Sequence, residues 1–436
     1  MSENRSAAED RSAKSTAENR SAAEDRSAKS TAENRSAAED RSAKSTAGFL
    51  MDNYPPQPVT FVRGSGSRLW DVDGKVYLDF LGGLAVTSLG HCHPAVTAAV
   101  AEQAATLLHV CNLYGTTVGP EVAATLDRLI GGTDRGRIFF ANSGAEANEC
   151  AIKLARKWGA GAGRGPNGVR RHAVVSTYGS FHGRTLATLA ATGQPAKHEA
   201  FQPLPEGFRH VAMGDIGAMD AAVDPAVVAA VLVEPIQGEG GVNVPPPGWL
   251  ADVRRLCDER DVLLMLDEVQ TGLGRTGDWF GFQHEGVEPD VVTMAKALGN
   301  GMPIGACWAK ADVAASFVPG DHGTTFGGQP LAAAAARAVL AVMEDEDVPA
   351  RATRAGALLA GGLAALPGVI SVRGRGLLLA AELDGPTARD VAAAALELGL
   401  VVNAVTPTAI RVAPSLLVTE AELDEALAVL EKVLSR

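Results

Sequence analysis

The sequence predicts an α/β protein with a large domain, built on a mostly parallel sheet flanked by helices, and a smaller α/β domain at the C-terminal end. Three observations lead to this fold class. At 436 residues, the chain exceeds the length of one average domain. Within 93–330, strand-like apolar runs alternate with helical patterns, which is typical of parallel strands joined by crossover helices. Further strands and helices follow in 331–436, so we expect a second domain there.

The first 47 residues form a tail that differs in composition from the rest of the chain. One 15-residue segment, residues 3–17, recurs identically at 18–32 and 33–47. Each copy has three acids and three bases, and alanine is its only apolar residue type. Such a segment cannot bury a core of its own, so we expect 1–47 to be disordered or partly helical.

The expected elements then follow in chain order. Residues 48–92 are predicted to contain short strands around Leu69–Trp70 and Val76–Leu78. In the large domain, apolar runs predict strands that end at polar residues, and a helical pattern follows the first of them. These elements are the strands 137–141, 172–176, 231–233, 263–266 and 291–295 and the helix 147–156.

The C-terminal part is predicted to begin with a long alanine-rich helix at 331–346. Strand patterns follow at 369–373, 377–381, 401–403 and 410–412. The segment Thr419-Glu-Ala-Glu422 has the pattern of a capping box, in which a threonine and a glutamate satisfy each other's backbone N–H groups. We therefore expect the last helix to begin there.

The composition fits a soluble cytosolic enzyme. Apolar residues make up 46% of the chain, and the net charge of −12 argues against nucleic acid or anionic membranes as partners. No apolar run approaches the ~18 residues that a membrane span requires, and the N-terminus lacks the hydrophobic region of a secretory signal. The five cysteines have no paired spacing, which fits a reducing compartment. We expect no metal site at His91-Cys92-His93, because consecutive strand residues point to opposite faces.

The most informative feature is an acid and a lysine at the ends of two apolar runs. Asp267 ends the run 263–266, and Lys296 follows the run 291–295. In an open α/β sheet, ligands bind at the carboxyl ends of the strands. An enzyme that uses pyridoxal phosphate (PLP) needs a lysine for the Schiff base and an acid beside the pyridinium nitrogen. Solvated loop residues at strand ends are the competing interpretation.

Two further segments favour the PLP interpretation. Ser143 and Gly144 lead from a strand into a helix, where unpaired backbone N–H groups suit a phosphate. An ordinary helix cap is the alternative there. Phe181 and Arg184 follow the strand 172–176, and such residues can stack on a cofactor ring and bind a carboxylate. A core phenylalanine beside a surface arginine is the alternative for this segment.

Together these motifs resemble those of the class III (subgroup II) PLP-dependent aminotransferases of fold type I. The resemblance covers about 48–436 and rests on six motifs in family order and spacing. It implies that 93–330 is the large PLP-binding domain and that 48–92 joins 331–436 in the small domain. The six motifs are Ser143–Glu149, Ser180–Thr185, Val233–Glu239, Leu266–Gly277, Ala295–Gly305 and Gly323–Gly328.

The resemblance also implies a role for each matched residue. Lys296 would hold PLP and move the substrate proton, and Asp267 would pair with the pyridinium nitrogen. The remaining cofactor contacts would come from Gly144, Ala145, Phe181, Glu268, Val269, Gln270 and Thr325. The substrate contacts would come from Arg184, Thr324, Arg411 and Glu239.

Two of these implied roles concern assembly and specificity. Thr324 and Thr325 would serve the active site of the other subunit, so the resemblance implies a homodimer with shared active sites. Glu239 would pair with Arg411 while the amino donor is bound and would release it when a dicarboxylate enters.

The resemblance extends to the acetylornithine aminotransferases of arginine biosynthesis. It rests there on Leu69–Asp79, Gly82–Val86 and Ala191–Pro195, and ornithine aminotransferases carry an aromatic residue near Leu84 that this chain lacks. The likeness implies N2-acetyl-L-ornithine and 2-oxoglutarate as substrates. Succinyl-diaminopimelate, ornithine, succinylornithine and 4-aminobutyrate stay open as amino donors, and so does a PLP-binding homologue without catalytic activity.

Overall fold

The computed structural model describes residues 49–55, 58–131, 135–385 and 387–435. The chain divides into two compact units, one of residues up to Arg63 with Trp70–Lys75 and one of Gly64–Leu69 with Val76–Arg436. The repeats predicted to be disordered or partly helical lie outside the described residues. The predicted large and small domains, with boundaries at 92 and 330, stay a prediction.

The first unit is small and has local contacts of its own. The guanidinium of Arg63 lies 4.4 Å from the centre of the Trp70 ring. One carboxylate oxygen of Asp71 accepts hydrogen bonds from the backbone N–H groups of Asp73 and Lys75, at 3.0 Å and 2.9 Å. These bonds close the turn that follows strand β2 (Arg68–Asp71), so the strand predicted around Leu69–Trp70 is confirmed.

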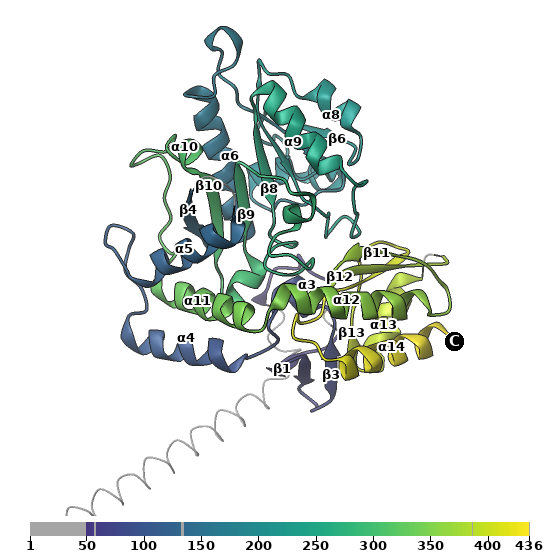
Figure 1. The fold of residues 1–436 in the computed structure, drawn as a ribbon. Coiled ribbons are helices and arrows are strands. Elements are labelled where there is room, and N and C mark those ends of the chain that lie inside the picture. The colour runs from purple at the N-terminus through teal and green to yellow at the C-terminus, as the bar shows by residue number, and fades with distance from the viewer. Residues whose placement is uncertain (1–48, 56–57, 132–134, 386, 436) are drawn as a thin grey trace, which may run out of the picture. The chain divides into compact units, whose positions relative to one another are not determined.

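The second unit is built on a seven-stranded sheet with the order β4-β10-β9-β8-β7-β5-β6 (Figure 1). Only β10 runs antiparallel to its neighbours, so the predicted, mostly parallel sheet is confirmed. The strands are β4 (Gly136–Ala141), β5 (Ala173–Thr177), β6 (Phe208–Val211), β7 (Val228–Val233), β8 (Leu263–Asp267), β9 (Val291–Met294) and β10 (Gly305–Lys310).

Alternate side chains along these strands point into two different hydrophobic cores, one on each face of the sheet. Leu264 and Leu266 of β8 belong to one core, together with residues of helix α9 (Trp249–Arg260). Leu263 and Met265 belong to the other core, together with residues of helix α6 (Gly144–Ala160). Successive strand residues point to opposite faces, so helices cover both faces of the sheet and hold its strand ends in fixed positions.

The remaining helices of this part of the chain are shorter or lie nearer its N-terminal end. They are α3 (Gly82–Ala85), α4 (Pro94–Thr106), α5 (Val118–Ile130), α7 (Leu186–Ala191), α8 (Ile216–Ala222) and α10 (Ala311–Ala314). Short 3₁₀ helices are η2 (Pro166–Gly168), η3 (Pro195–Lys197), η4 (Glu199–Phe201), η5 (Gly281–Glu285) and η6 (Lys296–Gly299). None of the described helices is both long and apolar enough to cross a lipid bilayer.

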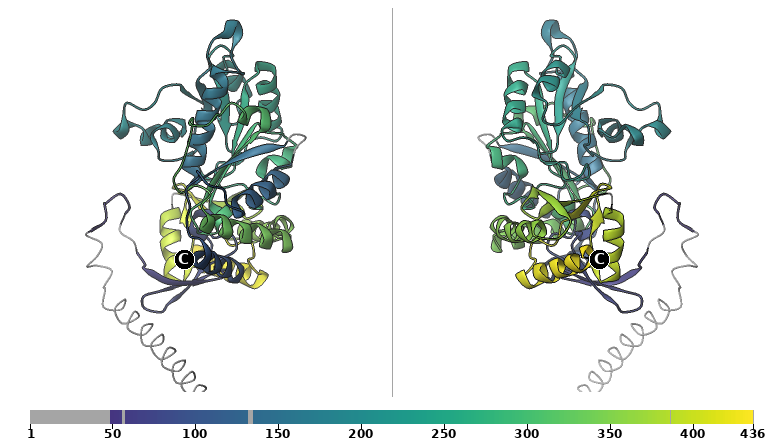
Figure 2. Two further views of the ribbon diagram at one scale, coloured as in Figure 1. Left: turned by 90° about the vertical axis from the view of Figure 1, so that its left-hand side faces the viewer. Right: turned by 90° about the vertical axis from the view of Figure 1, so that its right-hand side faces the viewer.

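A second, antiparallel sheet follows in the C-terminal part, with the order β11-β12-β15-β14. Helices α12, α13 and α14 pack on this sheet or on one another, and they lie together in both views of Figure 2. The elements are α11 (Pro330–Asp345), α12 (Val348–Ala364), β11 (Val369–Arg375), β12 (Leu378–Leu383), α13 (Ala388–Glu397), β13 (Leu400–Val401), β14 (Asn403–Ala404), β15 (Ala409–Val412) and α14 (Glu420–Leu434).

Two expectations for this part have clear outcomes. The capping box is confirmed, because Thr419 Oγ1 accepts from the backbone N–H of Glu422 while the Glu422 carboxylate accepts from that of Thr419. The single strand predicted at 401–403 is wrong, because the segment divides on either side of Val402. β13 pairs with β3 (Val76–Asp79) and β14 pairs with β15, so the two halves belong to different sheets.

Candidate active site

The carboxyl ends of β7, β8 and β9 surround a cavity of about 350 Å³. Asp267 is the last residue of β8, and Lys296 follows β9. Other cavity residues come from the start of α6 and from the segment after β5. The predicted site residues that line the cavity are Gly144, Ala145, Phe181, Arg184, Glu239, Asp267, Val269, Gln270 and Lys296.

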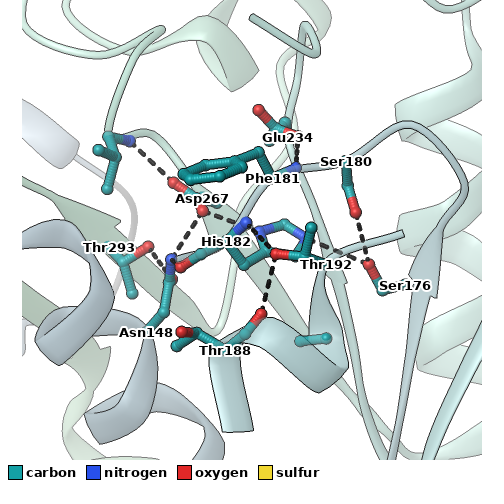
Figure 3. Close-up of polar contacts among 12 residues, drawn as sticks. Asn148, Ser176, Ser180, Phe181, His182, Thr188, Thr192, Glu234, Asp267 and Thr293 are labelled. Atoms are coloured by element: carbon teal, nitrogen blue, oxygen red, sulfur yellow. Dashed lines mark hydrogen bonds and ion pairs between the residues drawn. The ribbon is translucent and has the colours of Figure 1, made fainter. Parts of the chain in front are cut away.

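The carboxylate of Asp267 is buried and held by three donors (Figure 3). Its Oδ2 atom lies 2.7 Å from Asn148 Nδ2 and 2.8 Å from His182 Nδ1. Its Oδ1 atom accepts a hydrogen bond of 3.0 Å from the backbone N–H of Val269. A carboxylate fixed in this way at the floor of the cavity suits a cationic ring nitrogen as its partner.

Asn148 and His182 belong to the quoted motifs, but the sequence reasoning gave neither of them a role. Asn148 also donates to the backbone oxygen of His182 at 2.8 Å and accepts from Thr293 Oγ1 at 2.7 Å. The second ring nitrogen of His182 lies 3.1 Å from Ser176 Oγ. Both ring nitrogens of His182 thus have polar partners, so its ring orientation is fixed (Figure 3).

Lys296 lies in a setting that favours its neutral form. Burial lowers the pKa of its ammonium group, and the cation Arg411 acts in the same direction. The acids Glu239, Asp267 and Glu234 oppose this shift without reversing it. A lysine with a lowered pKa can serve as a nucleophile and as a base. Its backbone φ of +40° is uncommon for a residue with a side chain and is consistent with a functional position.

The start of helix α6 is a candidate anion cradle, the feature that the sequence predicts as a phosphate site. Ser143 is the N-cap residue, and its hydroxyl accepts from the backbone N–H of Glu146 at 3.2 Å. Gly144 and Ala145 follow and line the cavity. A Cβ atom on Gly144 would lie 2.8 Å from Val269 Cγ1, so only glycine fits there without displacement. Helix N-termini bind phosphate through their free N–H groups and partial positive charge.

Phe181 and Val269 line the same cavity as Asp267 and Lys296. The backbone N–H of Phe181 donates to Glu234 Oε2 at 3.0 Å, which fixes the start of this segment. Burial raises the pKa of Glu234 well above its ordinary value, and the nearby charge of Asp267 adds to the effect. The cavity therefore combines apolar side chains, a buried acid and a lysine, and these are the features that an aromatic phosphate cofactor requires.

Arg411 is 1% exposed and contacts two residues that line the cavity, Glu239 and Gln270. Its Nη1 atom donates to Glu239 Oε1 at 2.6 Å, to the backbone oxygen of Gly238 at 3.1 Å and to Gln270 Oε1 at 3.1 Å. Its Nη2 atom has no hydrogen-bond partner within the described part of the chain. Burial would raise the pKa of Glu239, but Arg411 and Lys296 together lower it. Glu239 is therefore held as a carboxylate beside this arginine.

Arg184, the second predicted carboxylate anchor, is exposed and lines the cavity near the Phe181 ring. Its guanidinium carbon lies 5.5 Å from the ring centre, and Lys197 Nζ lies at the same distance. Burial lowers the pKa of Lys197, and the charge of Arg184 adds to the shift. Sequence reasoning missed Lys197, which follows the matched segment Ala191–Pro195. Two cations at this position suit an anionic group on the substrate.

Four predicted site residues do not line this cavity: Arg411, which contacts the lining residues Glu239 and Gln270, and Thr324, Thr325 and Glu268. Thr324 and Thr325 line a separate hollow of about 830 Å³, where Asn112 Nδ2 donates to the backbone oxygen of Thr324 at 3.1 Å. Glu268 is 1% exposed, and its carboxylate accepts from the backbone N–H groups of Gly281 and Phe282, both at 3.0 Å. Its geometry indicates a structural contact with η5 instead of a cofactor contact. Among the described residues, no group of three or more metal-ligating side chains occurs.

Taken together, a lysine, a buried acid, apolar cavity walls and a helix N-terminus fit PLP, and they define a PLP-dependent enzyme of the aminotransferase fold. A model of the class III aminotransferase family matches residues 50–434. The chain therefore belongs to the class III aminotransferases, and the class predicted from its motifs is confirmed.

Individual proteins agree with this assignment. The acetylornithine aminotransferase of Mycobacterium tuberculosis is 50% identical over 389 residues, which cover 89% of this chain and 94% of that protein. The crystal structure of the ornithine aminotransferase from Toxoplasma gondii has a TM-score of 0.85 at 37% identity and covers 91% of this chain and 95% of its own. The acetylornithine aminotransferase from Elizabethkingia anophelis has a TM-score of 0.80 at 34% identity, covering 91% and 99%.

Gly144 provides a direct test of the anion cradle. We expect Gly144→Ala to weaken PLP binding about 10-fold, because overpacking costs about 1–3 kcal/mol and the added methyl group displaces Val269 or the helix start. The dissociation constant of PLP is measured by absorbance titration of the protein freed of cofactor. Gly361→Ala is the control, because nothing lies within 4 Å of a Cβ at that position. Unchanged PLP affinity in Gly144→Ala would contradict the cradle.

Glu268 provides a test of its buried structural role. Burial raises its pKa from 4.5 to about 7. A pKa that is higher in the folded state makes the free energy of unfolding fall as pH rises from about 4.5 to about 7, by roughly 3 kcal/mol at most. In Glu268→Gln, we expect the free energy of unfolding to decrease less between pH 5 and pH 8 than in wild type. Urea unfolding at the two pH values measures this difference. The exposed Glu206→Gln is the control; an equal slope in Glu268→Gln and wild type would refute the assignment.

Proposed function

We propose that this chain transfers the terminal amino group of N2-acetyl-L-ornithine to 2-oxoglutarate, which gives N-acetylglutamate 5-semialdehyde and glutamate. This reaction would place the protein in arginine biosynthesis, in the cytoplasm. The names of its relatives support the proposal, since proteins called acetylornithine aminotransferase are 47–50% identical over most of the chain. The observation that carries it is the ion pair between Arg411 and Glu239, at 2.6 Å.

The ion pair matters because the two half-reactions use different substrates. The acceptor, 2-oxoglutarate, has two carboxylates, whereas the amino donor has one carboxylate and a neutral acyl group. Arg184 binds the carboxylate that both substrates share, and Arg411 binds the second carboxylate of the acceptor. With Glu239 beside it, Arg411 is neutralised and the donor fits; once Glu239 moves away, the dicarboxylate finds a buried cation.

PLP, when bound, supplies the electron sink for the transfer. The side chains of this chain position it and move the proton. Asp267 would pair with the ring nitrogen, and Gly144 and Ala145 would present backbone N–H groups to the phosphate. Lys296 would take the proton from the substrate carbon that carries the amine, and its lowered pKa favours this role as a base. Gln270 lies between Arg411 and the cavity and is the proposed partner of the ring hydroxyl.

We also propose that two copies of the chain assemble with shared active sites. In this assembly, Thr325 would reach the phosphate bound by the second copy, and Thr324 would lie near its substrate. Their position supports the proposal, because both lie outside the cofactor cavity of their own chain. Several large apolar side chains near them are exposed, as expected for a surface that a partner covers: Leu113, Tyr114 and Phe326.

The first test is a single-turnover measurement on the PLP-loaded protein. The protein is mixed separately with N2-acetyl-L-ornithine, ornithine, succinyl-diaminopimelate and 4-aminobutyrate, and the absorbance of the bound cofactor is followed. We expect N2-acetyl-L-ornithine to react fastest and 2-oxoglutarate to restore the starting spectrum. Lys296→Ala is the control and should show no turnover. If ornithine or 4-aminobutyrate reacts faster, the substrate assignment fails while the aminotransferase class stands.

A second test concerns the acid that masks Arg411. Glu239→Gln removes the negative charge from the ion pair but keeps the size of the side chain. We expect glutamate, a dicarboxylate, to gain as an amino donor relative to N2-acetyl-L-ornithine by about 10-fold or more, because bonds between charged groups contribute about 1.5–3 kcal/mol. The ratio of the two single-turnover rate constants is measured. An unchanged ratio would show that Glu239 does not control access to Arg411.

A further inference from the structure

The segment that carries Glu239 is held against one face of the C-terminal sheet. In this sheet, Arg373 of β11 lies opposite Ala380 of β12, and Ala380 lies opposite Arg411 of β15. Asn403 of β14 continues the row on the far side of Arg411. Residues directly opposite each other in antiparallel strands share a face, so two arginines stand on this face with a small alanine between them.

Both arginines bind the backbone of the Glu239 segment. Arg411 Nη1 donates to the backbone oxygen of Gly238 at 3.1 Å. Arg373 Nε donates to the backbone oxygen of Gly241 at 2.8 Å. Glu239 lies between these two attachment points. The segment is therefore fixed to the sheet before and after the residue that faces Arg411.

Apolar contacts also hold the Glu239 segment against the C-terminal sheet. Ile236 and Val242 form one small buried cluster with Leu378 and Ala380 of β12 and with Ala409 of β15. Val242 is fully buried and has a φ of +55°, a backbone conformation that is rare for a β-branched residue. A strained conformation of this kind persists only where the surroundings fix it. The bond from Arg373 ends on the residue immediately before Val242, so it is one of the contacts that fix it.

Arg373 is itself held in place by an acid on the neighbouring strand. Its Nη1 atom lies 2.5 Å from Glu382 Oε2. A hydrogen bond from Thr408 lowers the pKa of Glu382, and Arg373 adds to the effect, so the acid stays charged. Arg373 does not line the cofactor cavity. Its contacts therefore point to the backbone of the segment and not to a ligand.

We propose that Arg373 is a positioning residue that sets the specificity of the Arg411 site. By fixing the backbone on the far side of Glu239, it keeps that carboxylate within reach of Arg411, so that unmasking requires rotation of the Glu239 side chain alone. This inference rests on the proposed role of Glu239. Without the Arg373 contact, the segment relaxes, the ion pair between Glu239 and Arg411 is populated less, and Arg411 becomes more accessible to dicarboxylates.

The test measures the binding of glutarate, a dicarboxylate that cannot accept an amino group, to the PLP-loaded protein by calorimetry. We expect Arg373→Met to bind glutarate about 5- to 10-fold more tightly than wild type, because Glu239 competes less for Arg411. Simple loss of a positive charge would weaken the binding of an anion, so the direction of the change separates the two explanations. Arg373→Lys, which keeps the charge and can reach one partner, should give an intermediate value.

Two further variants control for charge and folding. Arg375→Met removes the same charge two residues along β11 and should bind glutarate as wild type does, because the hydrogen bond to Gly241 comes from Arg373. Glu382→Gln leaves Arg373 intact but loosens its orientation, so it should shift glutarate binding in the same direction by a smaller factor. If Arg373→Met does not fold, Arg373→Lys and Glu382→Gln carry the test.

A double variant shows whether Arg373 acts through Glu239. In the Glu239→Gln background, adding Arg373→Met should change glutarate affinity no further. The inference is overturned if Arg373→Met and Glu382→Gln both bind glutarate as wild type does, or if the effect of Arg373→Met persists without the Glu239 charge. The amino-transfer measurement on wild type tests the proposed function separately, so it can succeed while the role of Arg373 fails.

Discussion

The buried carboxylate of Asp267 is the constraint on which the site depends. A charge at the end of a buried strand is stable only if donors surround it. Here the donors come from three separate parts of the chain: Asn148 from α6, His182 from the segment after β5, and the backbone of Val269 beyond β8. Because each donor must reach the same carboxylate, this one requirement brings together the start of helix α6, the segment after β5 and the end of β8. Lys296 then completes the arrangement from the next strand.

Much of this arrangement could be predicted from the sequence, because the relevant signals are local. Apolar runs that end in Asp267 and before Lys296 predict both the strands and the edge at which they end. The capping box at Thr419 is likewise a pattern within four residues. Partners that come from distant segments could not be predicted in this way. The roles of Asn148 and His182 depend on a shared partner more than 80 residues away from either. The contact of Glu268 with η5 and the division of 401–403 between two sheets are tertiary choices that local patterns do not contain.

The electrostatics of the cavity show why its charged residues cannot be considered one at a time. Burial alone would neutralise Lys296 and Glu239 alike, since it penalises any charge. Glu239 stays charged because Arg411 and Lys296 lie beside it, whereas the acids around Lys296 do not fully compensate for its burial. The pKa of the lysine and the pKa of the acid are therefore both lowered, and the acid lies beside a buried arginine. Under the proposed function, a substrate with a second carboxylate would change this balance by competing with Glu239 for the same guanidinium.

Such competition is selective only if the competing acid is held at a defined distance. A mobile loop would let Glu239 leave Arg411 at any time, and the buried guanidinium would then attract any anion. The backbone of the Glu239 segment is instead attached on both sides and is packed through Ile236 and Val242 onto strands β12 and β15. Arg411 belongs to β15, one of those strands. The same sheet therefore holds both the acid and the arginine that it pairs with. The proposed discrimination between two substrates would then require only rotation about the side-chain torsions of Glu239, without a change of fold.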